Sequence, residues 1–219
     1  MASSTQLSEC VAKQLGLPDA TVALHMRNIR EAGLITQGGR GRSSARMTAA
    51  DAANLLMASV GSLNPKDSVE VVGKYAGIAK TRRSNWEIGL VPKLDQLQKQ
   101  HTFAEALTAL IESAMANDIP IKNKDEVGYE AILITLFWPW DGTKIEFYKF
   151  DEAKYRRDPS KYDVMKPAEP HWLMYGAGFF LAPSRPPITP SVISKADFQQ
   201  ERKFTHRTIF ALANLLEDS

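Results

Sequence analysis

The chain has 219 residues, of which 44% are hydrophobic and 24% are charged, the composition of an ordinary globular protein. The formal net charge is only +2, which excludes a uniformly basic protein that binds nucleic acid over its whole surface. The only cysteine is Cys10, so an internal disulfide and a metal site built from several cysteines are excluded as well.

The chain lacks the signals that would direct it to a membrane. Its N-terminus does not have the basic start and apolar core of a signal peptide, and no run of about 18 apolar residues predicts a membrane span. We therefore expect a cytoplasmic protein. The length suits one large domain, or one small and one medium domain.

Two helices and a tight turn are predicted at the N-terminus. Leu7, Val11 and Leu15 recur at helical spacing and form one apolar stripe. Gly16 ends this helix, and Pro18 favours a turn before a second helix over residues 19–32, which we expect Asp19 to cap. Gly33 suits the left-handed position that ends such a helix.

The second helix separates into two faces. At 100° per residue, Val22, Met26 and Ile29 lie on one side and are expected to pack inward. The residues free to face a partner are Thr21, Leu24, Arg27 and Asn28. The helix is therefore predicted to present a mixed polar and apolar surface outward.

A basic hairpin is predicted after this helix. Residues 35–37 and 44–47 are expected to pair as short strands around a Gly/Arg-rich tip, where glycines permit positive φ. Thr48 and Asp51 then form a capping-box-like start for a third helix that extends to about Val60. These elements complete a predicted domain over residues 1–61.

The remaining chain is predicted to be a second, mixed α+β domain over residues 65–219. Helices are expected over 67–80 and 102–117, the second with a capping box of Thr102 and Glu105 at its start. A hairpin of strands 131–137 and 144–150 around Asp141-Gly142 follows. A third β-type run covers 172–181. A terminal helix is expected over 197–216, with its inward positions at Phe204, Ile209, Leu212 and Leu216. The predicted fold class is α+β with a small antiparallel sheet.

Basic residues gather in the N-terminal part. Between Thr21 and Thr48 the chain carries five arginines and a single acid, Glu31. A local positive charge of this kind is what contacts to nucleic-acid phosphates require, although a solvated charged face is the alternative interpretation.

This segment resembles the winged helix-turn-helix domains of bacterial and phage transcription regulators. The resemblance covers about the first 60 residues and rests on the stretches Val11-Ala12-Lys13-Gln14-Leu15-Gly16-Leu17, Thr21-Val22, His25 to Ile35 and the Gly/Arg tip. It implies that the second helix enters the major groove, and that the order helix, turn, helix and hairpin serves double-stranded DNA.

The resemblance also implies roles for individual residues. Arg27 would donate two hydrogen bonds to guanine, Asn28 would pair with adenine, and Leu24 would meet a thymine methyl, with Thr21 beside them. Arg40 and Arg42 would reach the DNA backbone or the adjacent minor groove. Arg30 and Arg46 would hold phosphates.

The sequence does not predict an enzyme. Its four histidines are His25, His101, His171 and His206, and their spacing matches no metal-binding motif. No nucleophile elbow or phosphate-binding loop is present, so we expect neither a cofactor nor a metal ion. Trp138, Trp140 and Trp172 are interpreted as core residues, with a small-molecule pocket as the alternative.

The main functional hypothesis is a sequence-specific DNA-binding transcription regulator of bacterial or phage type. Because one small domain contacts only a short site, a homodimer is expected, and the C-terminal domain would supply dimerisation, a protein partner surface or an effector pocket. Two alternatives remain open. One is a phage DNA-packaging or replication protein, and the other is a protein-binding inhibitor that uses the helix-turn-helix as a scaffold.

Overall fold

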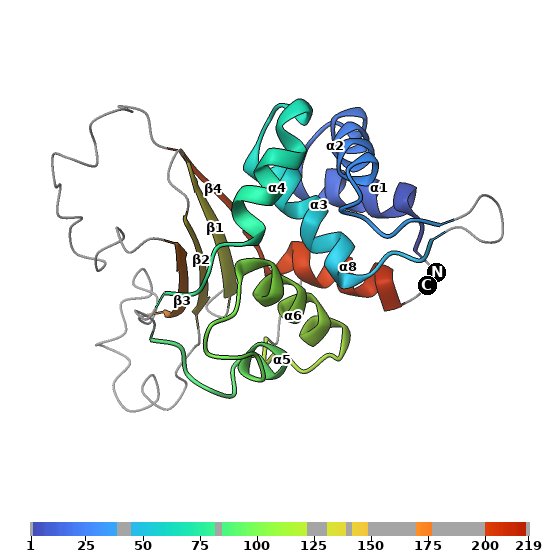
Figure 1. Ribbon diagram of the computed structural model, residues 1–219. Helices are drawn as coiled ribbons and strands as arrows, with labels where there is room; N and C mark the ends of the chain where they lie inside the picture. Colours follow the sequence, from blue (N-terminus) through green and yellow to red (C-terminus); the bar gives the residue numbers. More distant parts are fainter. Residues whose placement is uncertain are drawn as a thin grey trace, which may run out of the picture.

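The computed structural model describes residues 2–38, 45–81, 85–121, 131–138, 142–148, 170–176 and 200–217. In these ranges the chain forms a cluster of helices that covers one face of an antiparallel four-stranded sheet (Figure 1). The predicted α+β class is therefore confirmed. The N-terminal and C-terminal ends of the chain lie near each other on the helical side.

The two N-terminal helices form as predicted. Helix α1 (Ser4–Leu15) begins after a capping box of Ser3 and Gln6, and it ends at Gly16 with φ of 65°. Helix α2 (Asp19–Glu31) has Pro18 at its N-cap, so Asp19 is not the capping residue. It ends in a Schellman motif, in which the N–H of Leu34 donates to the carbonyl of Ile29 at 2.8 Å.

The predicted strands of the hairpin are not present among the described residues 35–38 and 45–47, and a winged helix is not confirmed. The two arms do approach each other, since a side chain at Gly38 would collide with the backbone of Ala45. Their backbone donors, however, have other partners. The N–H of Thr36 donates to the carboxylate of Asp51, and the N–H of Met47 donates to the carbonyl of Ala2 at 3.1 Å. The tip, residues 39–44, lies outside the described residues.

Helix α3 (Ala49–Gly61) runs through the middle of the helical layer. Its capping box of Thr48 and Asp51 is confirmed, and its length agrees with the prediction. Most of its side chains are buried, because α2, α4 and α6 all pack against it. A helix buried on all sides has no polar face, which explains its run of Ala, Leu and Met.

A short 3-10 turn, η2 (Pro65–Asp67), leads into α4 (Ser68–Ala76), and α5 (Pro92–Asp95) and α6 (Phe103–Met115) follow. Helix α4 is shorter than predicted, because Ala79 and Lys80 form isolated β-bridges with Thr102 and Tyr175. The predicted capping box of Thr102 and Glu105 at the start of α6 is confirmed.

The sheet has the order β3-β2-β1-β4. The predicted hairpin is confirmed as β1 (Ala131–Trp138) and β2 (Gly142–Tyr148), and the third run is β3 (His171–Gly176). Ile134 lies opposite Ile145 in β2 and Phe204 in β4, which forms an apolar row across the sheet. This row faces the helices and joins the core.

The prediction of a terminal helix over 197–216 is wrong for the residues before His206 that the structure describes. Residues Gln200–Thr205 form the edge strand β4, and only His206–Glu217 form helix α8. An edge strand and a helix both allow Phe204 and Ile209 to face inward, so the apolar spacing could not distinguish them. The predicted inward positions Phe204, Ile209, Leu212 and Leu216 are all buried, as expected.

The core is continuous through the helical layer. Buried residues of α1, α2 and α3 belong to the same cluster as those of α4, α6, α8 and the sheet. Helix α8 packs against both α1 and α6, so the two ends of the chain share this core. Packing therefore crosses the predicted boundary at residues 61–65. No helix in the part of the chain that the structure describes is long and apolar enough to cross a bilayer.

Candidate nucleic-acid interface

Helix α2 has a buried face and an open face. Val22, Met26 and Ile29 are at most 4% exposed, which confirms the predicted inward face. On the opposite side, Leu24 is 49% exposed and Arg27 has a side chain that is 65% exposed. The outer face of α2 also includes exposed Ala20, Ala23, Arg30 and Glu31.

Two of the predicted DNA-facing residues, Asn28 and Thr21, do not lie on the open face of α2. The side-chain amide of Asn28 donates a hydrogen bond to the carbonyl of Pro65 at 2.5 Å, so Asn28 holds α2 against η2. Thr21 is half-buried on the same side of the helix. The angles of Thr21 and Asn28 on α2 keep both residues off the inward face, but the later segment at Pro65 lies against this side of the helix.

His25 also faces the segment that contains Pro65 and Ser68, and it is fully buried. Its Nδ1 is 2.8 Å from the hydroxyl of Ser68, whose proton is donated to the carbonyl of Pro65. Since the hydroxyl has one proton, His25 Nδ1–H is the donor, and in the neutral ring Nε2 is then the unprotonated atom. This Nε2 is buried and has no hydrogen-bond partner among the described residues. Burial lowers the pKa of His25, and the nearby Asp67 opposes this shift.

Arg27 and Glu31 form an ion pair on the open side of α2. Arg27 Nε donates to Glu31 Oε1 at 2.7 Å, one helical turn away. Both side chains are more than half exposed, so the pair contributes little to stability. It favours one direction of the guanidinium over the others.

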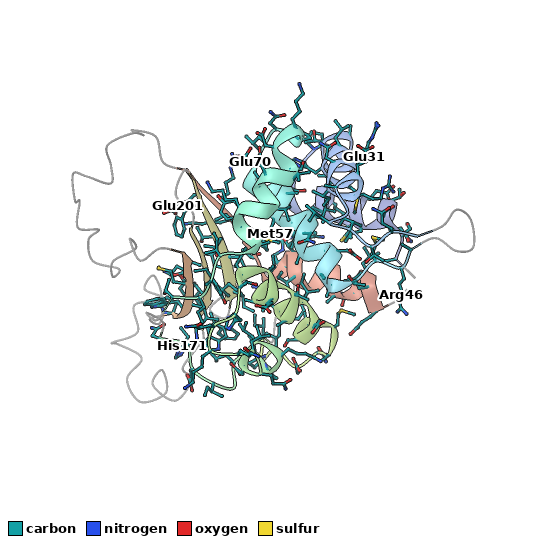
Figure 2. All side chains as sticks on the ribbon, in the orientation of Figure 1. Glu31, Arg46, Met57, Glu70, His171 and Glu201 are labelled. Carbon is teal, nitrogen blue, oxygen red and sulfur yellow. The ribbon has the colours of Figure 1, made fainter. Side chains whose placement is uncertain are left out.

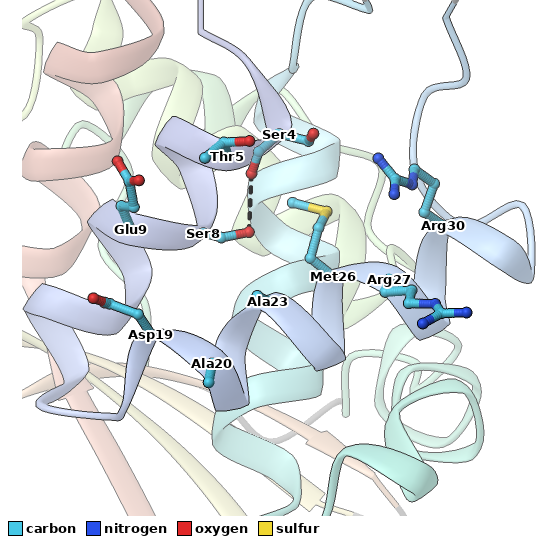
Figure 3. A pocket seen from close by; sticks show the side chains of 10 residues that line it. All are labelled: Ser4, Thr5, Ser8, Glu9, Asp19, Ala20, Ala23, Met26, Arg27 and Arg30. Atoms are coloured by element: carbon cyan, nitrogen blue, oxygen red, sulfur yellow. Dashed lines mark hydrogen bonds between the residues drawn. The ribbon is translucent and has the colours of Figure 1, made fainter.

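A groove of about 310 Å³ runs between α1 and α2 (Figure 3). Glu9 and Asp19 lie at one end, and Arg27 and Arg30 lie at the other. The floor is formed by small or apolar side chains, with Ala20, Ala23 and Met26 on α2. The groove is therefore acidic at one end and basic at the other, where the exposed Arg27 and Arg30 lie.

Arg30 also borders the N-terminus of α1. A hollow of about 210 Å³ there is lined by Ser3, Ser4, Arg30, Thr36, Gln37, Gly38, Ala45 and Met47. The first turn of a helix carries a partial positive charge, and an arginine beside it adds a full one. This corner of the molecule consequently favours an anion.

Asp51 fixes the base of the Arg-rich segment. Its carboxylate, 3% exposed, accepts hydrogen bonds from the backbone N–H groups of Thr36 and Thr48, both at 2.8 Å, and from their hydroxyls. The capping interaction with Thr48 was predicted, whereas the bridge to Thr36 was not. Through these bonds Asp51 joins the arm at Thr36 to the arm that ends at Thr48 without a β-ladder.

The arginines of this segment are described only in part. Arg46 is exposed and points away from the helical layer, at the same end of the molecule as Glu31 (Figure 2). His171 and Glu201 lie at the opposite end, on the sheet. Arg40 and Arg42 lie outside the described residues, so their predicted roles remain predictions.

The histidines and tryptophans do not form a second site in the described residues. His101 pairs with the hydroxyl of Tyr175 at 2.9 Å, and His171 lies 3.2 Å from Glu87. No group of three or more His, Cys, Asp or Glu side chains that the structure describes could hold a metal ion. Trp172 is half-buried with Lys144 Nζ 5.8 Å from its ring centre, while Trp140 and the side chain of Trp138 lie outside the described residues.

In comparisons with known proteins, no family model, no curated protein and no solved structure matches this chain.

Proposed function

We propose that this protein binds double-stranded DNA through the outer face of α2, as a transcription regulator of bacterial or phage type. The observation that carries the proposal is the position of Arg27 and Arg30. Both are exposed beside the N-terminus of α1, on a helix whose other sides pack against α1, α3 and α4. A rigid helix with an open basic side suits the major groove.

The phosphate contacts in this proposal come from three places. Arg30 lies next to the positive end of α1, so a phosphate there meets an arginine and helix N–H groups together. Arg46 adds a charge from the arm that Asp51 holds in place. Arg40 and Arg42 would extend the same basic surface. These contacts orient the protein on DNA without reading sequence.

The C-terminal part of the chain has a different role in the proposal. We propose that it supports a homodimer, a protein partner or an effector pocket, because a single α2 covers only a short site. In a symmetric dimer, two copies of α2 would read two half-sites, and the bound sequence would be palindromic.

The direct experiment is a mobility shift on fragments of genomic DNA at low salt. The double variant R27A/R30A should lose most of the affinity of the wild-type protein, because it removes both exposed arginines of the reading helix. Arg207→Ala is the matched control: it removes an exposed arginine from α8, away from α2. Unchanged binding by R27A/R30A would refute the proposed surface.

The alternative functions give different results in solution. Light scattering of the free protein should show a dimer, whereas a ring or a larger assembly would favour DNA packaging. A protein without DNA affinity at low salt that captures a defined partner would favour the inhibitor hypothesis.

A further inference from the structure

The ion pair between Arg27 and Glu31 uses only one of the three guanidinium nitrogens. Glu31 accepts from Nε of Arg27, at 2.7 Å. The two terminal nitrogens have no hydrogen-bond partner among the described residues, and the side chain is 65% exposed. The pair therefore leaves the end of the guanidinium fork open and favours one direction of the side chain.

An open fork of this kind matches the major-groove edge of guanine. Guanine presents two acceptors there, O6 and N7, and the two terminal nitrogens of arginine can donate to both at once. An arginine already held by a carboxylate loses less side-chain freedom when it binds. Glu31 thus prepares Arg27 for this contact without touching the base.

The neighbours of Arg27 allow close approach. On the same side of α2, Ala20 and Ala23 are exposed and carry only a methyl group. Leu24 is 49% exposed and lies about 4.5 Å from Arg27 along the helix axis, a little more than one base-pair step of about 3.4 Å. Its side chain offers an apolar surface for the methyl group of thymine.

The other candidate readers are already engaged. The amide of Asn28 is bonded to Pro65, and Thr21 is half-buried on the side that η2 and α4 cover. Base recognition by α2 therefore falls to fewer side chains than the sequence predicted.

The resemblance already implies that Arg27 reads a guanine and that Leu24 meets a thymine methyl. We infer further that Arg27 is the residue of α2 that determines specificity, because Asn28 is bonded to Pro65, and that Glu31 is the positioning residue of Arg27. This inference rests on the proposed DNA-binding function. It assigns the sequence preference of α2 to a pair of side chains one helical turn apart.

The first experiment selects bound sequences from a random double-stranded DNA library with the wild-type protein. The selected site should contain an invariant guanine. Replacing this guanine with 7-deazaguanine, which keeps O6 but lacks the N7 acceptor, should weaken wild-type binding by about 2- to 13-fold, because half of the about 1–3 kcal/mol of a bidentate pair is lost. Arg27→Ala should bind both duplexes with equal affinity.

The second experiment tests Glu31 by a readout that separates position from charge. Glu31→Gln removes a negative charge near the phosphates, so its affinity for random DNA should rise, while its discrimination against 7-deazaguanine should fall. Glu9→Gln is the matched control, since it removes the same charge at the other end of the groove. It should keep the discrimination of the wild-type protein.

The outcomes distinguish the inference from the function on which it rests. If the wild-type protein binds no duplex at low salt, both fail. If it selects a site whose recognition does not change with 7-deazaguanine at any guanine, or if Arg27→Ala retains the discrimination, DNA binding stands and the assignment of Arg27 is overturned. If Glu31→Gln discriminates as well as Glu9→Gln, the positioning role of Glu31 is wrong.

Discussion

His25 Nδ1 lies 2.8 Å from the hydroxyl of Ser68, and this contact joins the proposed reading helix to the segment that follows α3. The bond continues through Ser68 to the carbonyl of Pro65, which also accepts from Asn28. A side of α2 that would be open in an isolated helix-turn-helix is consequently part of the protein interior.

The stability of the protein should fall in mild acid. Burial lowers the pKa values of both His25 and His101, so the unfolded chain binds more protons than the folded one below a pH of about 6.5. The free energy of unfolding should be steady above this pH and decrease as the pH falls below it. Urea unfolding measured at a series of pH values tests this.

Two variants locate the origin of the acid effect. His25→Asn retains a donor for Ser68 but does not titrate, so it should flatten the acid decrease while lowering stability at neutral pH. His171→Asn alters a histidine that is only half-buried, and should leave the acid decrease in place. An equal acid decrease in the wild-type protein and in His25→Asn would contradict the buried neutral state of His25.

Asn28 should act through stability and not through DNA recognition. Asn28→Ala removes one of the two donors to the Pro65 carbonyl, which keeps its bond from Ser68, and we expect a loss of about 0.5–1.5 kcal/mol in the free energy of unfolding. The affinity of the folded protein for its selected DNA site should remain within about twofold. A large loss of affinity at unchanged stability would restore the adenine-reading role that the sequence predicted.

Asp51 should be important for the arm that carries Arg46. Asp51→Asn replaces one acceptor oxygen by a donor in a buried site where the neighbouring N–H and O–H groups already donate, so we expect a loss of about 1–3 kcal/mol. The exposed Asp118, changed to Asn, is the control and should change stability by less than about 0.5 kcal/mol. Chemical denaturation of both variants gives the comparison. Equal stability of the two would contradict the bridging role of Asp51.

The predicted N-terminal domain should not fold as a separate fragment. Residues 1–61 would expose the faces of α1 and α3 that pack against α4, α6 and α8 in the full chain. We therefore expect a fragment of residues 1–61 to show little helical circular dichroism and no cooperative thermal transition. A stable, cooperative fragment would support two independent domains.

The sequence predicted those elements whose signals are local. The capping boxes at Thr48 and Thr102, the glycine ends of α1 and α2 and the β1–β2 hairpin all depend on residues close in the chain, and all are present. The strand β4 was missed because its identity depends on pairing with β1, about 70 residues earlier. Local spacing does not contain this information.

The candidate site was predicted in part for the same reason. Leu24, Arg27 and Arg30 are exposed because of their angles on α2, which the sequence specifies directly. The engagement of Asn28 and His25 depends on Pro65 and Ser68, some 40 residues later, and no periodicity in α2 indicates it. The predicted strands of the wing do not form in the described residues, because the N–H groups of Thr36 and Met47 donate to Asp51 and Ala2 and not across a ladder.

The salt dependence of DNA binding tests the central claim most directly. We predict that the logarithm of the affinity for a double-stranded fragment falls linearly with the logarithm of salt concentration, and that Arg30→Ala makes this slope shallower by about 0.9, the loss of one phosphate contact. Arg207→Ala should leave the slope unchanged. No binding at low salt, or the same slope for the wild-type protein and Arg30→Ala, would contradict the proposal that α2 and the neighbouring end of α1 form a DNA-binding surface.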